Sequence, residues 1–256
     1  MMSDKNILIT GSNGGIGFSI AELLAKQNAK LTLLYHENNQ KIEKLNDEST
    51  YVEIVKTDLS NSIKLDETIN TIMKKHSIDI FIHSPAYPIQ HTDIMKLTLD
   101  DFQKQFDLQM KSFFQISKSI VPQMKSNKFG KIISILTSYL IGKPPNLLAD
   151  YIVAKYSLLG MTKCMATELG PFGITVNSVS PSMVNTPLTE SLPKKLKEIT
   201  KSQVPLESRL AEPVDIAEVV HFLCSESSNY ITGENILVTG GVSRTNHSAV
   251  KLIVSK

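Results

Sequence analysis

Cysteine is scarce in this chain and tryptophan is absent. Among 256 residues there are two cysteines, Cys164 and Cys224, and they form neither a CxxC pair nor a spacing typical of metal ligands. We therefore expect two buried free thiols. The six histidines are scattered, without an HxH or HExxH pair, and we expect no zinc or other metal site.

The chain also lacks a long apolar run, an excess of one charge sign and a linker. No stretch approaches the roughly eighteen apolar residues of a membrane helix, and the start "MMSDKNILITG" lacks a signal-peptide pattern, so we expect a cytoplasmic protein without a membrane segment. The formal charge of +2 arises from interspersed signs and indicates no nucleic-acid partner. Without a composition break or repeat, we expect one domain over residues 1–256.

Short apolar runs alternate with segments of helical period along the whole chain. The helical segments carry apolar residues at i, i+3, i+4 and i+7. The apolar runs start at Asn6, Lys30, Tyr51, Asp79, Lys131, Ile174 and Asn235. Repeated strand-helix alternation predicts an α/β protein with a doubly wound, Rossmann-like parallel sheet of about seven strands and helices on both faces.

A glycine cluster, "TGSNGGIG" from Thr10 to Gly17, follows the first predicted strand and opens the first predicted helix. Gly11 would permit a tight turn, Gly15 a close approach of backbone to a pyrophosphate, and Gly17 close packing of helix against strand. The helix N-terminus would then face the phosphates. This placement indicates a dinucleotide site, and the missing Gly-Lys-Ser/Thr excludes a P-loop.

A second pattern lies far downstream, where Tyr151 precedes Lys155 by four residues at the start of a predicted helix. Residues four apart share one helix face. A free tyrosine titrates near pH ~10, and a nearby ammonium would favour the tyrosinate. The pair could therefore form a reaction centre, although a solvent-facing helix surface can carry the same two residues.

The glycine spacing followed by Tyr151-xxx-Lys155 resembles the short-chain dehydrogenase/reductase family in its single-domain form. The resemblance spans nearly the whole chain and includes "TDLS" with Asp58, "PSMVNTP" from Pro181 and the C-terminal third. It is most similar to the 3-oxoacyl-(acyl-carrier-protein) reductase type. It implies that Tyr151 is the general acid and base, that Lys155 is its electrostatic helper, and that an upstream hydroxyl polarises the substrate carbonyl.

The resemblance also implies a set of cofactor-binding residues. These are Gly11, Ser12, Asn13, Gly15, Ile16, Gly17, Tyr35, His36, Asp58, Leu59, Ser84, Tyr151, Lys155, Pro181, Val184 and Thr186.

Two residues compete for the role of the upstream hydroxyl. Counting back from Tyr151 by the separation usual in the family leads to Ser138, whereas counting forward from Gly130 leads to Thr137. An inserted loop residue would favour Thr137. We expect Ser138, because serine is the usual residue of the family, and keep Thr137 as the alternative.

Several positions depart from the family pattern. "HSPA" from His83 stands in place of Asn-Asn-Ala-Gly and includes Pro85. Gln109 stands where the family has an asparagine whose backbone carbonyl helps to hold a proton-relay water, so we include it in the catalytic group. Ser182 replaces the glycine of Pro-Gly. We expect a structural role for His83, because Tyr151 already supplies proton transfer.

Cofactor choice depends on the end of the second strand. NAD enzymes place a carboxylate there to bind the ribose 2′-hydroxyl, but this position is Tyr35, followed by His36. We expect NADP, with Ser12, Asn13 and His36 near its 2′-phosphate. The alternative is NAD, bound with the help of Glu37.

The segment 186–212 leaves the strand-helix rhythm, and the resemblance implies a lid over the substrate. We expect an enzyme that transfers hydride between NADPH and a small or carrier-bound ketone, such as a 3-oxoacyl thioester. The alternatives are an NAD-dependent sugar, steroid or alcohol dehydrogenase and a non-catalytic dinucleotide sensor. Surplus apolar positions in 99–124 and 151–169 predict a homodimer or homotetramer.

Overall fold

A computed structural model describes residues 4–47, 51–190 and 192–242. They contain one seven-stranded sheet, all of whose strand pairs are parallel, in the order β3-β2-β1-β4-β5-β6-β7. The prediction of a doubly wound parallel sheet is confirmed. The strands are β1 Asn6–Thr10, β2 Lys30–Tyr35, β3 Val52–Lys56, β4 Ile80–His83, β5 Gly130–Ile135, β6 Ile174–Pro181 and β7 Asn235–Val238.

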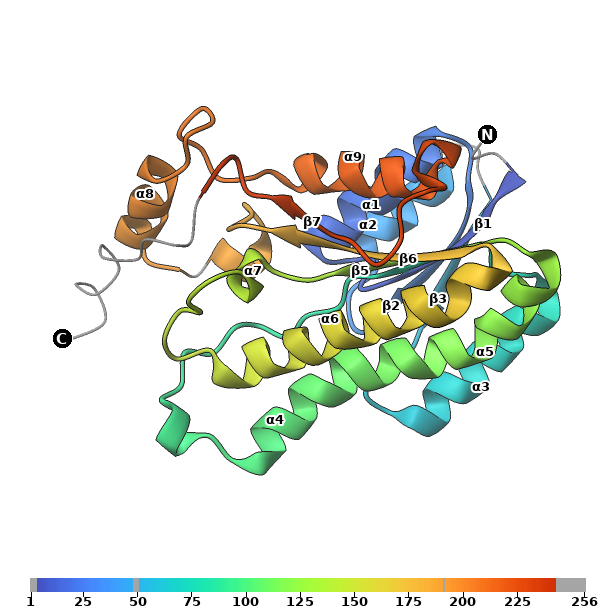
Figure 1. The fold of residues 1–256 in the computed structure, drawn as a ribbon, viewed down its shortest axis with the longest axis horizontal. Helices are drawn as coiled ribbons and strands as arrows, with labels where there is room; N and C mark the ends of the chain where they lie inside the picture. Colours follow the sequence, from blue (N-terminus) through green and yellow to red (C-terminus); the bar gives the residue numbers. More distant parts are fainter. Residues whose placement is uncertain (1–3, 48–50, 191, 243–256) are drawn as a thin grey trace.

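Two helical layers cover the sheet (Figure 1). One layer holds α1 Gly15–Lys26, α2 Gln40–Glu43 and α9 Pro213–Cys224, and the other holds α3 Ser62–Lys75, α4 Leu99–Phe106, α5 Ser112–Asn127 and α6 Ala149–Leu169. Each layer packs its own apolar cluster against one face of the sheet. The central strands are therefore buried on both faces, which explains their continuous apolar runs.

The strand order reverses between β1 and β4, so that the chain leaves these neighbouring strands toward opposite helical layers. Open parallel sheets bind ligands at such a switch point, beyond the carboxyl ends of the strands. The glycine cluster after β1 and the His83 segment after β4 both lie there, as does the segment after β5. The topology thus gathers residues from three distant parts of the sequence.

The segment 99–124 has a helical period but does not form one uninterrupted α-helix. It consists of α4, a π-helical turn at Asp107–Lys111 and α5. In the turn, the backbone N–H of Ser112 donates to the carbonyl of Asp107, five residues back. Helical periodicity predicted the segment but not this turn, because one extra residue hardly changes the apolar pattern. Such turns occur frequently at functional sites.

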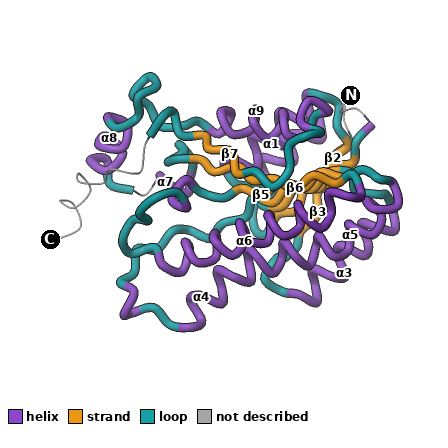
Figure 2. Tube along the Cα trace, viewed as in Figure 1, coloured by secondary structure: helices purple, strands orange, loops and turns teal. Residues whose placement is uncertain are grey.

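The segment 186–212 crosses one end of the sheet (Figure 2) and carries two short helices, α7 Pro187–Glu190 and α8 Lys194–Ser202. Of the two cysteines, Cys224 is buried but Cys164 is exposed on α6, so the expectation that Cys164 is buried was wrong.

Within the described ranges, the structure shows no helix of the length and apolarity needed to cross a membrane.

Candidate active site

A cavity of about 890 Å³ lies beyond the carboxyl ends of the strands. Its walls come from the turns after β1, β2, β3, β4, β5 and β6, from the start of α6 and from the segment that carries α7 and α8. A volume of this size accommodates a large cofactor together with a substrate.

The glycine turn is shaped by close contacts at the positions that the sequence indicated. Gly11 has φ of +67°, and a Cβ atom on Gly17 would collide with the carbonyl oxygen of Gly11. A Cβ atom on Gly15 would lie 2.5 Å from Cγ2 of Thr186, so this glycine brings the turn against the segment after β6. Helix α1 begins here without a side-chain cap and without an acidic residue in its first turn. Exposed N–H groups at a helix N-terminus suit a pyrophosphate, so the turn fits a dinucleotide.

The far end of the cavity is lined by Tyr35, His36, Glu37 and Asp58. Asp58 accepts hydrogen bonds from the N–H and hydroxyl of Ser60, and these bonds hold the pKa of its carboxyl below the ordinary value. Asp58 is therefore a fixed anion at this end. Glu37 extends into solvent beside His36, with 3.9 Å between Oε1 and the Nδ1 of the histidine.

Tyr151 and Lys155 lie on one face of α6 and both line the cavity, although they are 8% and 3% exposed. The Nζ of Lys155 donates to the carbonyl of Ile135 at the end of β5, over 2.7 Å, and lies 5.8 Å from the centre of the Tyr151 ring. The helix therefore presents the pair toward the sheet rather than to solvent. The interpretation of these residues as a solvent-facing surface is excluded.

Burial governs the ionisation of both groups in the protein alone. It raises the pKa of Tyr151, against hydrogen bonding with Thr137, and it lowers the pKa of Lys155 to about 7. Both groups are desolvated, and desolvation disfavours either charge; the expectation that Lys155 and a bound nicotinamide cation together favour a tyrosinate stays a prediction. Tyr151 is consequently a protonated phenol at neutral pH.

The hydroxyl beside Tyr151 belongs to Thr137, not to Ser138. Thr137 lines the cavity together with Tyr151, and its hydroxyl opposes the rise in the pKa of the phenol. Ser138 does not line it, and its buried hydroxyl has no hydrogen-bond partner among the described residues. The cavity lining therefore agrees with the forward count from Gly130.

Most of the predicted cofactor residues line this one cavity. They are Gly11, Asn13, Gly15, Ile16, Gly17, Tyr35, His36, Asp58, Leu59, Ser84, Tyr151, Lys155, Pro181, Val184 and Thr186. Ser12 does not line it, because its buried hydroxyl donates to the carbonyl of Leu34. Gln109 does not line it either. Its backbone carbonyl, expected to hold a water, lies 2.8 Å from Nε2 of His83.

Apolar side chains that the sequence did not single out also line the cavity. They are Tyr87, Ile89, Leu108, Tyr139, Leu148, Met183, Leu188, Leu192 and Leu196. Several belong to connections between elements, whose course no local pattern predicts. The adjacent turns after β4 and β5 were the only available signal.

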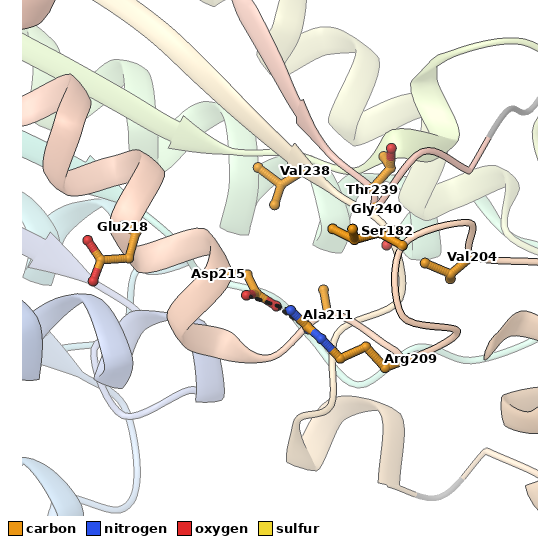
Figure 3. A pocket seen from close by; sticks show the side chains of 10 residues that line it. Ser182, Val204, Arg209, Ala211, Asp215, Glu218, Val238, Thr239 and Gly240 are labelled. Atoms are coloured by element: carbon orange, nitrogen blue, oxygen red, sulfur yellow. Dashed lines mark hydrogen bonds and ion pairs between the residues drawn. The ribbon is translucent and has the colours of Figure 1, made fainter.

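A second, smaller cavity of about 320 Å³ lies where 204–211 returns to the sheet (Figure 3). Arg209 crosses its wall and forms two hydrogen bonds with the carboxylate of Asp215, of 2.6 and 3.1 Å. Ser182 lines both cavities, but Tyr151 and Lys155 do not line this one. The ion pair attaches the end of the segment 186–212 to α9, and this cavity lacks the reactive pair.

Comparison with known proteins agrees with this geometry. A family profile described as Enoyl-(Acyl carrier protein) reductase matches residues 11–243. A 3-oxoacyl-(acyl-carrier-protein) reductase of Rickettsia felis is 32% identical over 241 residues, covering 94% of this chain and 98% of the relative. The human dehydrogenase/reductase SDR family member 4 is 32% identical over 245 residues, covering 94% and 88%.

Solved structures show the same fold. The crystal structure of a 3-oxoacyl-(acyl-carrier protein) reductase from Brucella melitensis has a TM-score of 0.88 at 23% identity, covering 94% of this chain and 92% of that one. A putative gluconate dehydrogenase from Agrobacterium tumefaciens has a TM-score of 0.87 at 24% identity, covering 94% and 96%.

Proposed function

The chain belongs to the short-chain dehydrogenase/reductase family and is an oxidoreductase, and from this premise we propose that it reduces a ketone with NADPH. The observation that carries the proposal is that Thr137 and Tyr151, with Lys155 beside them, line the cavity that the glycine turn enters. These groups supply a proton donor and a polarising hydroxyl in one place. A nicotinamide nucleotide held by the glycine turn would supply the hydride.

Tyr151 acts as the general acid in this proposal. Its buried phenol keeps its proton at neutral pH, because burial raises its pKa. A carbonyl oxygen that gains negative charge during reduction accepts that proton, and the hydroxyl of Thr137 stabilises the same oxygen. Lys155, anchored on the carbonyl of Ile135, is the nearest cation that can favour the resulting phenolate.

The substrate end of the cavity favours an apolar carbonyl compound. Tyr87, Ile89 and Leu148 belong to or pack against the apolar cluster that contains Tyr151, and they line the cavity together with the leucines of the segment 186–212. Charged groups of the cavity are concentrated at the nucleotide end, apart from Lys155. An acyl chain would bury its methylene groups on this wall. We propose a 3-oxoacyl thioester, free or on a carrier protein, with the segment 186–212 as its lid.

The nucleotide end carries the preference for NADP. Tyr35 occupies the position where a carboxylate would bind the ribose 2′-hydroxyl, and Asn13 and His36 line the same end. Ser12 does not join these residues, because its hydroxyl donates a hydrogen bond to the carbonyl of Leu34. Glu37 is the one feature that favours NAD, because it is an acid at the edge of the cavity.

The direct test is a substrate panel with each nucleotide, followed at the absorbance of the reduced nicotinamide. We expect NADPH-dependent reduction of acetoacetyl and longer 3-oxoacyl thioesters. Reduction of the carbon-carbon double bond of an enoyl thioester would replace the proposed reaction, and oxidation of sugars or alcohols with NAD would support the alternative dehydrogenase. A chain that binds nucleotide but turns over none of these compounds would be a sensor.

We also propose assembly through the layer of α4, α5 and α6. Leu99, Phe114, Val153 and Tyr156 are exposed on these helices, from 44% to 87%, and a second copy of the chain would cover such surface. Light scattering at micromolar concentration should show a dimer or tetramer, and Phe114→Asp should shift the protein toward monomer.

The cytoplasmic location and the absence of a nucleic-acid partner stay predictions.

A further inference from the structure

The ring of His83 connects three elements beneath the cavity. His83 ends β4, and the sheet register pairs it with Thr10 at the end of β1. Its Nδ1 lies 2.9 Å from the hydroxyl of Thr10, and its Nε2 lies 2.8 Å from the backbone carbonyl of Gln109 in the π-helical turn. The ring also packs against Phe81 and Phe113 at centroid distances of 5.6 and 5.4 Å.

These contacts determine the tautomer of His83. A carbonyl oxygen can only accept a hydrogen bond, so Nε2 must carry the proton that it donates to Gln109. Nδ1 of the neutral ring is then an acceptor, and the hydroxyl of Thr10 donates to it. Both ring nitrogens are engaged, so the ring cannot pass on a proton without losing one of these bonds.

Protonation of the ring is disfavoured as well. His83 is buried, and the charged group that faces it is Lys155 on α6. Burial first, and then the charge of Lys155, lower the pKa of His83 to about 3. His83 is therefore a neutral residue with a structural role at physiological pH, rather than a second acid or base for the reaction.

The carbonyl oxygen of Gln109, which His83 binds, belongs to a turn that packs against the helix of the reactive residues. The π-helical turn 107–111 packs against α6, which carries Tyr151 and Lys155. Leu108 of the turn lines the cavity. The side chain of Gln109 is held separately, because its Nε2 donates to Oε1 of Gln105 over 2.8 Å. The His83 bond is thus a tie from this turn to the central sheet.

We propose that His83 is a positioning residue, which fixes the Gln109 carbonyl and with it the π-helical turn that supports the reactive face of α6. The inference deepens the proposed function and rests on it for its effect on turnover. It assigns a purpose to the histidine where the family resemblance led us to expect an asparagine. The shorter amide would reach Thr10 from the same backbone position but not the carbonyl of Gln109.

Two substitutions test the hydrogen bonds of the two ring nitrogens separately. His83→Asn places an amide near the former Nδ1 and keeps an acceptor for Thr10, but it removes the donor to Gln109. His83→Gln is long enough to place an N–H near the former Nε2 and keeps that donor. The pair is matched in chemistry and differs by one methylene group.

We expect His83→Asn to lower kcat at least about tenfold, since a misplacement of ~1 Å can cost about 100-fold. His83→Gln should stay within about threefold of wild type, because the carbonyl keeps its donor. In hydrogen-deuterium exchange, amides 107–113 should exchange faster in the asparagine variant and at nearly the wild-type rate in the glutamine variant. Equal turnover and equal exchange in the two variants would overturn the proposal.

A measurement on the wild type covers the case in which His83→Asn does not fold. The imidazole ¹⁵N resonances of His83 should show the Nε2–H tautomer and should not titrate between pH 5 and 8, because burial and the charge of Lys155 disfavour the cation. An Nδ1–H tautomer, or titration in this range, would overturn the proposal. If the wild type reduces no ketone while the exchange contrast persists, the proposed function fails and the tie between His83 and Gln109 stands.

Discussion

The two ends of the cavity use different parts of the polypeptide. At the nucleotide end, backbone geometry dominates: Gly11, Gly15 and Gly17 allow the turn to close, and the helix N-terminus is left open to an anion. At the reaction end, buried side chains dominate, and burial shifts the pKa values of Tyr151 and Lys155 in opposite directions. Binding thus depends on shape and N–H groups, whereas the reaction depends on a few desolvated functional groups. The two ends should therefore fail independently when each is altered.

Removal of the phenolic hydroxyl should give the largest effect at the reaction end. Tyr151→Phe leaves the ring packing intact and should lower turnover by at least about 100-fold, the lower range for a lost general acid. NADPH affinity, measured by fluorescence titration, should hardly change. Tyr156→Phe is the matched control, because that tyrosine is on the same helix and bonds the carbonyl of Leu140 outside the cavity. Retention of more than about a tenth of the turnover, with chemistry rate-limiting, would show that Tyr151 is not the acid.

A comparison of Thr137 with Ser138 should sharpen the assignment of the second hydroxyl. Thr137→Val removes the hydroxyl that faces Tyr151 and should lower kcat by about 10- to 100-fold, in the range of a lost polarising donor. Thr137→Ser should retain most of the activity. Ser138→Ala removes a hydroxyl that does not line the cavity and should leave kcat nearly unchanged. The reverse ranking would restore Ser138 to the role that the family spacing predicted.

At the nucleotide end, the identity of residue 35 should affect binding without affecting the chemistry. We expect NADPH to bind at least about tenfold more tightly than NADH, a difference of about 1.4 kcal/mol. Tyr35→Asp supplies the missing carboxylate and should reverse the preference, because it accepts from a ribose hydroxyl and repels a 2′-phosphate. The saturated kcat should be retained. Equal affinities of the wild type for the two nucleotides would reject the NADP assignment.

A further effect, on stability rather than on turnover, follows from the ionisation of Lys155. Its pKa is about 7 in the folded protein and near 10.5 when exposed, so between these values the unfolded chain binds the additional proton. The free energy of unfolding should therefore rise with pH in this window, and this contribution should be lost as pH falls from 10.5 to 7. Relative to Lys155→Met, wild type should gain about 1 kcal/mol per pH unit from pH 7 to 9 in urea titrations.

A surface lysine tests whether that slope comes from burial. Lys163 is exposed on the same helix, and Lys163→Met should show the same pH dependence as wild type. A slope shared by both methionine variants and wild type would indicate that Lys155 is solvated in solution.

The sequence was most informative where function imposes a local pattern. The glycine spacing and the separation of Tyr151 from Lys155 are short-range constraints, and both led to residues that line one cavity. It was misleading where a side chain could face either of two directions. Ser12 and Ser138 are both buried hydroxyls next to cavity residues, and one residue of register decides which neighbour faces the ligand. No composition or period contains that information.

The order of apolar runs and turns by itself determined the parallel sheet, the position of the dinucleotide turn and the reactive face of α6, because period and spacing act within a few residues. The tertiary structure decided that Thr137 rather than Ser138 meets Tyr151, and that His83 holds the carbonyl of Gln109. It also decided the shifted pKa values of Tyr151 and Lys155. These features depend on the packing of segments that are separated in the sequence and on the exclusion of water between them, and desolvation exists only once that packing is complete.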